Sequence, residues 1–468
     1  MASENALAPE KPSGKQLSKV AGPLLLWGIA VGAVISGDYY GWNAGLGLTG
    51  YWGYLVAIGL MGLLYAGLSA SISELGTAIP HAGGAYAYTR TALGRVWGFL
   101  AGAMVQMQFV FAPVAVALTT GAYVQILFPQ VPVLLTAAIL YIASTGLHLM
   151  GAGSSMWVDF IFTAVATVGL VVFAVVGIPH ISIENLNVHS DGAVFPQGIG
   201  GLWGALPLAA WFFFAIEATP MAAEETKNPA KDLPKALFWA FITLALVGVS
   251  TLTVAAGVGG KDLANSAAPL ADTLMSIVGD QAWIIPSISI FAIASLIASF
   301  HAIVLAYSRQ TFALSRAGYL PAGLSTLNKH HVPTWGLIVP GAVGLVFCVL
   351  GDTVLPDAIP VLINLSVFAA AISYVLMTLS TIVLRKTRPD LKRPVKVPGG
   401  IVIPAVSMVL AVILIPAALW GFPLAFVIGV GVVALYLVYY SVAAKKRVSR
   451  YTLEEELALV ESAEEELE

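Results

Sequence analysis

The chain has 468 residues, of which 58% are hydrophobic and only 10% are charged. Soluble domains carry about 25% charged residues, so this composition excludes a soluble globular protein and predicts a polytopic protein in a lipid bilayer. The N-terminal lysines are too few and too widely spaced to indicate a nucleic-acid partner. The single cysteine, Cys348, excludes an intramolecular disulfide.

The apolar runs predict an all-α membrane protein with twelve spans of about 20 residues each. The first span, residues 20–47, is expected to be interrupted near Ser36, Gly37 and Asp38. The other eleven are expected at 51–78, 95–127, 131–149, 155–178, 203–223, 236–259, 282–315, 334–351, 357–384, 401–419 and 422–443. The first 19 residues are polar and the first apolar run is too long for a signal peptide, so no cleavable leader is expected.

Positive charge separates cleanly in this twelve-span arrangement. All but one of the 22 Lys and Arg residues fall on one side, and only Lys261 falls on the other. By the positive-inside rule both termini are expected in the cytoplasm. The absence of long glycosylated loops and targeting signals favours a bacterial inner (plasma) membrane.

The stretch VISGDYYGWNAG, residues 34–45, contains Asp38, which is the only acid between Val20 and Tyr65. A carboxylate inside a membrane is costly unless it faces protein or water and has a partner. Gly37 and Gly41 flank it and favour a broken helix, whose free backbone groups can bind a ligand. We therefore predict that Asp38 receives a cationic substrate.

Aromatic side chains surround this acid and predict further contacts with a cation. Tyr39, Tyr40 and Trp42 lie next to Asp38 in the sequence, and Trp211 lies in the sixth span. Aromatic faces attract cations by about 2 kcal/mol when water is excluded.

The sixth span repeats the pattern of the first, with Glu217 three residues before Pro220, which is expected to disrupt the helix there. Paired interrupted spans indicate a transporter substrate site. Glu217 either accepts a hydrogen bond from the substrate or stabilises the broken helix. Glu224 and Glu225, followed by Lys227, are expected to form a solvated helix end with local ion pairs.

Several other polar residues in apolar runs allow two interpretations each. Gln106 and Gln108 lie on different faces of the third span, and we choose Gln106 as the one lining the site. Asp159 is a candidate for gating or proton coupling, or else it is an acid that stabilises the start of a helix. His301 is likewise a candidate for gating or proton coupling, or else it is a hydrogen-bonded histidine of the core. Ser295 and Ser299 supply hydroxyls for a sodium site, or else pack helices closely.

Motifs for other chemistries are missing from the sequence. It contains no GxxxxGK[ST] phosphate loop, no Cys/His metal spacing and no Gly-x-Ser-x-Gly elbow. We expect neither an enzyme nor a bound cofactor or metal. A membrane-embedded sensor of small amines remains an alternative from another class.

Three stretches resemble the amino acid–polyamine–organocation (APC) transporters. They are PHAGGAYAYTRTALGRVWGF at 80–99, AAEETKNPAKDLPKA at 222–236 and SRQTFALSRAGYLPAGLSTLNKHHVPTWGL at 308–337. The resemblance implies a LeuT-type fold in which spans 1–5 and 6–10 are inverted repeats and spans 1 and 6 are unwound at mid-membrane. With the predicted spans and the charge separation, this divides the chain into a cytoplasmic tail (1–19), a transport core (20–384), a cytoplasmic linker (385–400), two peripheral helices (401–443) and a second cytoplasmic tail (444–468).

The first span departs from the pattern of amino acid carriers in this family. Those carriers usually have a Gly-Ser-Gly-Ile-Phe-like stretch that binds the substrate carboxylate, whereas this chain has Ile35-Ser36-Gly37-Asp38-Tyr39. A carboxylate there repels an amino acid's carboxylate and attracts an ammonium. The GDYYGWN stretch resembles the ethanolamine permease branch, which implies import of ethanolamine by alternating access. A monomer or weak homo-oligomer is expected.

Alternatives to ethanolamine remain open, namely transport or exchange of amino acids or of polyamines. The coupling ion also remains open between a proton and sodium. Some proton-coupled relatives have a lysine in the fifth span, and this chain has none there.

Overall fold

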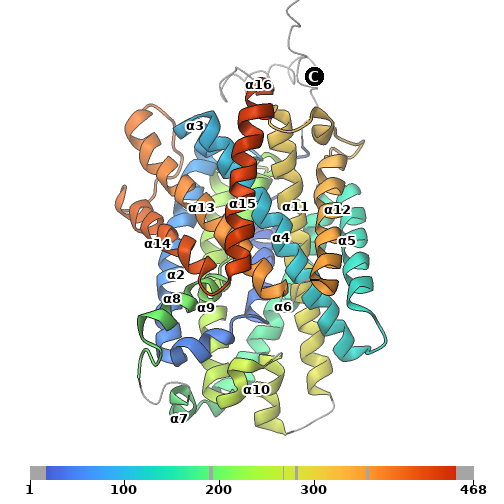
Figure 1. Ribbon diagram of the computed structural model, residues 1–468, viewed down its shortest axis with the longest axis vertical. Coiled ribbons are helices and arrows are strands. Elements are labelled where there is room, and N and C mark those ends of the chain that lie inside the picture. The colour runs from blue at the N-terminus through green and yellow to red at the C-terminus, as the bar shows by residue number, and fades with distance from the viewer. Residues whose placement is uncertain (1–16, 189–192, 267, 280–282, 355–357, 449–468) are drawn as a thin grey trace, which may run out of the picture.

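The computed structural model is a bundle of helices (Figure 1) and describes residues 17–188, 193–266, 268–279, 283–354 and 358–448. The expected cytoplasmic tails lie mostly outside these residues, which leave out residues 1–16 and 449–468. Within the described ranges, β pairing is limited to two isolated bridges, Ala21 with Thr226 and Leu327 with Pro333.

Nine helices of the described part are long and apolar enough to cross a bilayer. They are α2 (Ala44–Ala78), α4 (Arg95–Leu127), α6 (Ala152–Gly177), α9 (Pro229–Gly259), α11 (Ile284–Arg316), α12 (Thr334–Thr353), α13 (Ala358–Thr387), α14 (Val402–Leu419) and α15 (Pro423–Tyr439). The apolar span of α6 continues to His180, and that of α15 continues to Arg447. Shorter helices occupy the other three predicted spans: α1 (Pro23–Ile35), α5 (Val133–Leu149) and α8 (Gly198–Ala210). Each predicted range thus contains helix, and the number of membrane crossings stays a prediction.

Connections between these helices contain the short helices α3 (Ala85–Leu93), α7 (Ile183–Asn187) and α10 (Pro269–Val278), and α16 (Lys445–Arg447) follows α15. A proline is the first residue of α1, α9, α10 and α15. Proline is suited to this position because the N–H group that it lacks would have no acceptor within the helix. Glycines at positive φ follow α9 and α10, at Gly260 and Gly279.

The first predicted span is interrupted. After α1 the chain forms a short 3₁₀ turn, η1 (Ser36–Asp38), and residues 39–43 are not helical. Helix α2 then begins at Ala44 and changes direction at Gly50, whose φ of 61° is outside the helical range. Helical residues 44–49 therefore belong to the end of the predicted first span, and the second span starts after Gly50.

The sixth predicted span is interrupted earlier than Pro220 predicts. Helix α8 ends at Ala210, residues 211–215 form turns, and Ala215 has a left-handed φ of 76°. A ten-residue 3₁₀ helix, η3 (Ile216–Glu225), follows and contains Pro220. Such long 3₁₀ segments are uncommon and often mark a hinge.

Both described chain ends lie on the same face of the bundle. Leu17 packs with Ala82 and Phe312, and the Tyr439 hydroxyl donates to the Tyr319 carbonyl (2.7 Å) at the end of α11. Figure 1 shows α3 and α16 at this end and α7 and α10 at the opposite one. We call these the terminal face and the distal face. Ends on one face require an even number of crossings.

Candidate functional site

The two interruptions meet in the interior of the bundle. Gly37 in η1 packs directly on Trp211, and a Cβ atom at Gly37 would lie 2.5 Å from the Trp211 carbonyl oxygen. Only glycine fits at that distance. The Tyr40 ring meets Trp211 edge-on, with ring centroids 6.3 Å apart.

A small enclosed cavity of about 10 Å³ lies beside this contact. This volume has room for about one water-sized sphere. The cavity is bordered by α1, η1, α4, the 211–215 turn and α11. Its lining residues are Ala33, Val34, Ser36, Val116, Trp211, Phe214, Ser299 and Ile303.

Asp38 is fully buried, and neither of its carboxylate oxygens accepts a hydrogen bond from the described residues. The side chain faces α9, because a Cβ at Gly248 would lie 3.3 Å from Asp38 Oδ1. From the same η1 turn it is Ser36, not Asp38, that lines the small cavity. Asp38 is thus a buried acid in the non-helical stretch after α1, and its carboxylate is turned towards α9.

Glu217, in contrast, is held by donors from two other helices. Gln108 of α4 donates to Glu217 Oε1, and the Tyr374 hydroxyl of α13 donates to the same oxygen at 2.6 Å. The Tyr65 hydroxyl of α2 lies 3.2 Å from that of Tyr374. Glu217 therefore connects the second interruption to α2, α4 and α13.

Gln108 is the glutamine that reaches this network, and sequence reasoning did not select it. The Gln106 side chain instead accepts a hydrogen bond from the Thr311 hydroxyl of α11 (3.2 Å). The two-residue spacing shows that Gln106 and Gln108 lie on different faces of α4. Which of these faces meets Glu217 depends on how α4 packs against the other helices.

The other aromatic candidates support the first interruption. The Tyr39 hydroxyl donates to the Ala166 carbonyl of α6 (2.7 Å), and Trp42 Nε1 donates to the Asp38 carbonyl (3.0 Å). Trp42 also packs on Phe212. Their polar atoms are used by the fold, so Tyr40 and Trp211 are the predicted aromatics placed beside a cavity.

A much larger cavity, of about 1070 Å³, lies towards the distal face, where α4 ends and α13 begins. Tyr40, Thr119 and Tyr123 are among the residues that line it. Tyr40 packs on Trp211, which lines the small cavity, so this aromatic pair lies between the two cavities.

Towards the terminal face the site is closed by an ion pair. The Arg309 guanidinium of α11 binds both carboxylate oxygens of Glu225, at 2.5 and 3.2 Å, and both side chains are buried. The Glu225 carbonyl accepts from the N–H groups of Val20 and Ala21 (both 2.9 Å), just before α1. The expectation of a solvated helix end was wrong, because the partners come from α11 rather than from Lys227.

A second layer of contacts ties the loop before α3 to this closure. Glu224 accepts from Arg316 (2.6 Å) and from the Ala82 N–H (2.9 Å), and the His81 ring Nε2 lies 2.9 Å from Arg316. Burial raises the pKa of Glu224, but Arg316 and His81 outweigh it and lower that pKa to about 2. Burial and then Arg316 lower the pKa of His81 to about 3.

His301 belongs to a network of hydrogen bonds with consistent donors and acceptors. Its ring stacks on His148 with centroids 3.9 Å apart, and Ser155 Oγ bridges His301 Nε2 (2.8 Å) and His148 Nδ1 (2.6 Å). His148 Nε2 lies 3.0 Å from the His301 carbonyl, and Ser144 Oγ lies 2.8 Å from His301 Nδ1. Two neutral rings satisfy all four contacts, which favours the hydrogen-bonded role over proton coupling.

Asp159 of α6 is a second buried acid without a hydrogen-bond partner among the described residues. It faces α1, since a Cβ at Gly32 would lie 3.1 Å from Asp159 Oδ2. Of the candidate serines, Ser299 donates to the Ala33 carbonyl of α1, whereas Ser295 donates to Ala292 within its own helix (both 2.7 Å). Asp159 and Ser299 thus contact α1 from two sides.

Comparison with known proteins finds similarity to membrane transporters. The family described as amino acid permease matches residues 26–451. The branched-chain amino acid permease of Bacillus subtilis (strain 168) is 28% identical, covering 86% of this chain and 88% of its own length. The methylthioribose transporter of that strain is 27% identical (93% and 95% covered). The large neutral amino acids transporter small subunit 2 of Mus musculus is also 27% identical (92% and 82% covered).

Among solved structures, a manganese transporter of Eremococcus coleocola superposes with a TM-score of 0.60. The alignment covers 95% of each chain at 14% sequence identity. At this identity the superposition shows a shared fold and says nothing of the substrate.

Proposed function

The chain belongs to the amino acid permease family, and from this premise we propose that it is a secondary transporter importing ethanolamine by alternating access. The observation that supports the substrate is the buried carboxyl group of Asp38 in the interruption after α1, which accepts no hydrogen bond from the described residues. A buried ionised carboxylate without a partner is strongly unfavourable. An ammonium group on the substrate offsets this cost through a charge-assisted hydrogen bond.

The same carboxylate disfavours substrates that carry a carboxylate of their own. Two like charges a few ångströms apart repel strongly in a medium of low dielectric constant. Ethanolamine has an ammonium and a hydroxyl and no carboxylate. In the proposed complex the ammonium binds Asp38, and the hydroxyl binds exposed backbone or Glu217 Oε2, which accepts no hydrogen bond from the described residues.

Binding requires the small cavity to enlarge, because about 10 Å³ does not hold a molecule of four heavy atoms. We propose that Asp38 turns from Gly248 towards this cavity and that Trp211 and Tyr40 move apart. Their ring faces then contact the ammonium, a contribution of about 2 kcal/mol when water is excluded.

The proposal of alternating access rests on a difference between the two sides of the small cavity, which is closed by fewer contacts on the distal side than on the terminal side. On the distal side the Tyr40–Trp211 contact lies between the small cavity and the large one. On the terminal side the Glu225–Arg309 pair and the Glu224–Arg316 layer close the path. We propose that the distal face is extracellular and the terminal face cytoplasmic, so that the structure represents a state closed to the cytoplasm.

Ion coupling is proposed to involve Asp159, whose carboxyl group faces α1 at Gly32. A proton that neutralises Asp159 would let α1 pack against α6, and its loss would favour separation of the two helices. This role is distinct from substrate binding at Asp38.

A second candidate function is the transport of neutral amino acids. It is favoured by the family and by relatives named as carriers of branched-chain and large neutral amino acids. A polyamine carrier would use Asp38 and Glu217 as two anionic sites, but two donors already satisfy one Glu217 oxygen.

The test is uptake of labelled ethanolamine into proteoliposomes, with unlabelled ethanolamine, putrescine and alanine as competitors. Asp38→Asn is compared with Asp352→Asn, the same substitution at an exposed position of α12. We expect uptake that alanine does not inhibit, lost by about 10- to 100-fold in Asp38→Asn because a charged hydrogen bond contributes about 1.5–3 kcal/mol. Competition by alanine together with an active Asp38→Asn would establish an amino acid carrier. Binding without accumulation would indicate a sensor.

A further inference from the structure

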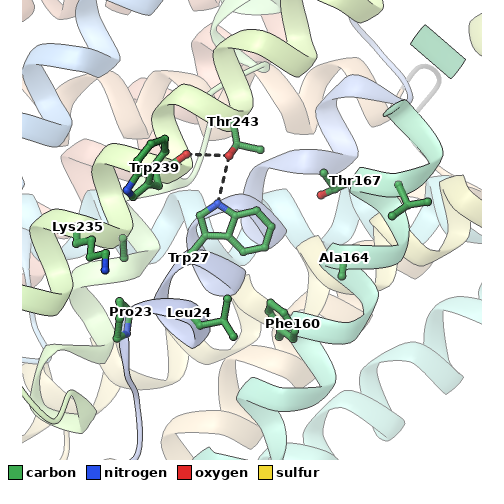
Figure 2. A pocket seen from close by; sticks show the side chains of 11 residues that line it. Pro23, Leu24, Trp27, Phe160, Ala164, Thr167, Lys235, Trp239 and Thr243 are labelled. Atoms are coloured by element: carbon green, nitrogen blue, oxygen red, sulfur yellow. Dashed lines mark hydrogen bonds between the residues drawn. The ribbon is translucent and has the colours of Figure 1, made fainter. Parts of the chain in front are cut away.

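A groove of about 650 Å³ lies on the outer surface of the bundle between α1, α6 and α9 (Figure 2). It is separate from both cavities of the candidate site. Its lining residues are Pro23, Leu24, Trp27, Phe160, Ala164, Thr167, Val168, Lys235, Ala236, Trp239 and Thr243.

Trp27 forms the centre of the groove. Its Nε1 donates to the Thr243 hydroxyl (3.3 Å), and its ring meets Phe160 edge-on with centroids 6.2 Å apart (Figure 2). With the indole N–H satisfied, the groove offers an apolar surface. Leu24 and Trp239 on its borders are 53% and 54% exposed.

Basic side chains lie at the end of the groove nearest the terminal face. Lys235 lines this end, and Lys231 is exposed one turn earlier on the same side of α9. Lys19 is also exposed. It lies near the start of α9, because the carbonyl of Ala21, two residues further on, accepts a hydrogen bond from the N–H of Lys227. Asp232 is the acid of this first turn of α9, so the positive charges outnumber the negative one.

The length of the groove fits a single lipid leaflet. Lys235 and Thr243 are eight residues apart on α9, which corresponds to about 12 Å along a helix. Half of a hydrocarbon core of about 30 Å is about 15 Å. An acyl chain lying beside Trp27 would therefore leave its headgroup phosphate at the level of the lysines.

We propose that this groove binds one anionic phospholipid, with an acyl chain along Trp27 and the phosphate on Lys231 and Lys235. A neutral lipid would fill the apolar surface but would leave the basic end unmatched. Because the groove joins α1 to α9, the bound lipid would hold α1 in place and stabilise the state that is closed at Glu225 and Arg309. This inference does not depend on which substrate is carried.

The first test measures bound lipid directly by native mass spectrometry. Purified full-length protein is titrated with phosphatidylglycerol or with phosphatidylcholine of identical acyl chains. The variant Lys231→Gln/Lys235→Gln is compared with Lys445→Gln/Lys446→Gln, which removes two exposed lysines of the same face away from the groove. We expect the first variant to bind phosphatidylglycerol about 30-fold more weakly, at about 1 kcal/mol per lysine, and the control to bind normally.

The second test fills the groove. Ala164→Phe places a ring in it, whereas Val165→Phe places the same ring at an exposed neighbouring position that does not line the groove. We expect only Ala164→Phe to lose the tightly bound phosphatidylglycerol. Equal binding of the two lipids by wild type, unchanged binding in both groove variants, or a dimer that only Ala164→Phe disrupts would overturn the proposal.

Discussion

The interruption after α1 and the interruption after α8 both contain buried acids, and their surroundings differ. In the second, Glu217, Glu224 and Glu225 each accept hydrogen bonds from other elements. In the first, Asp38 has no partner among the described residues, and neither has Asp159, which faces α1 from α6. The partnered acids fix η3 to α4, α11 and α13.

This difference suggests separate roles for the two regions. An acid whose donors are supplied by the fold contributes to stability, and losing one partner of a buried pair leaves an uncompensated charge. An acid without a donor is available to a mobile cation, such as an ammonium or a proton. The region after α1 would then bind ligands, and the region after α8 would keep the closure in place.

The largest effect expected from this comparison concerns the closure. Arg309→Met leaves Glu225 buried without its partner, so we expect the free energy of unfolding to fall by about 3–5 kcal/mol. Arg388→Gln breaks the exposed Arg388–Asp390 pair and should cost less than about 1 kcal/mol. Thermal unfolding in detergent micelles measures both. Equal, small losses would show that Glu225 does not depend on Arg309.

Uptake kinetics compare the two central acids directly. We expect Asp38→Asn to lose about 10- to 100-fold of the uptake rate, because it removes the charge that binds the ammonium. Glu217→Gln keeps an oxygen that accepts from Gln108 and Tyr374, so its loss should stay below about tenfold. The reverse order would mean that Glu217 binds the substrate and Asp38 supports the fold.

The proposed coupling role of Asp159 can be tested by measuring two activities separately, namely uptake driven by a pH gradient and exchange of labelled for unlabelled substrate. A gradient of one pH unit supplies about 1.4 kcal/mol, which is about a tenfold accumulation. We expect Asp159→Asn to abolish accumulation driven by a pH gradient and to retain counterflow of labelled against unlabelled substrate. Loss of both activities would show a structural role, and retention of both would remove Asp159 from coupling.

Much of the helix pattern is predictable, because the length of an apolar run is a local property. The third predicted span, 95–127, has the bounds of α4, and Gly37 and Gly41 indicate the first interruption. The second interruption was placed at Pro220, whereas the helix ends ten residues earlier, at Ala210. The packing of Trp211 on Gly37 accompanies that earlier end, and no local signal in the sequence reports it.

Partners of the site residues were less predictable than the residues themselves. Glu225 and Arg309 are 84 positions apart, and Gln108 and Glu217 are 109 apart. Sequence spacing indicates which residues share a helix face, but the packing of separate helices decides which faces meet. The direction of Asp38 towards Gly248 depends on the same packing.

The smallest expected effect is a pH dependence that distinguishes the closure from the ligand site. His81 is buried and neutral in the folded protein, with its pKa lowered to about 3, first by burial and then by Arg316. The unfolded chain takes up this proton near pH 6.5, so stability falls as pH decreases below 6.5. Glu224, with a pKa of about 2, loses its contribution only between about pH 4.5 and 2.

Between pH 7.5 and 5.5 we therefore expect His81 to account for up to about 1.4 kcal/mol of lost stability. His81→Asn keeps an acceptor for the Gly83 N–H and should flatten the dependence of melting temperature on pH over this range. His330→Asn, at an exposed loop position, should leave that dependence unchanged. If His81→Asn melts with the wild-type pH dependence, then the closure at the terminal face is insensitive to His81, and any acid sensitivity of transport must come from the α1 region.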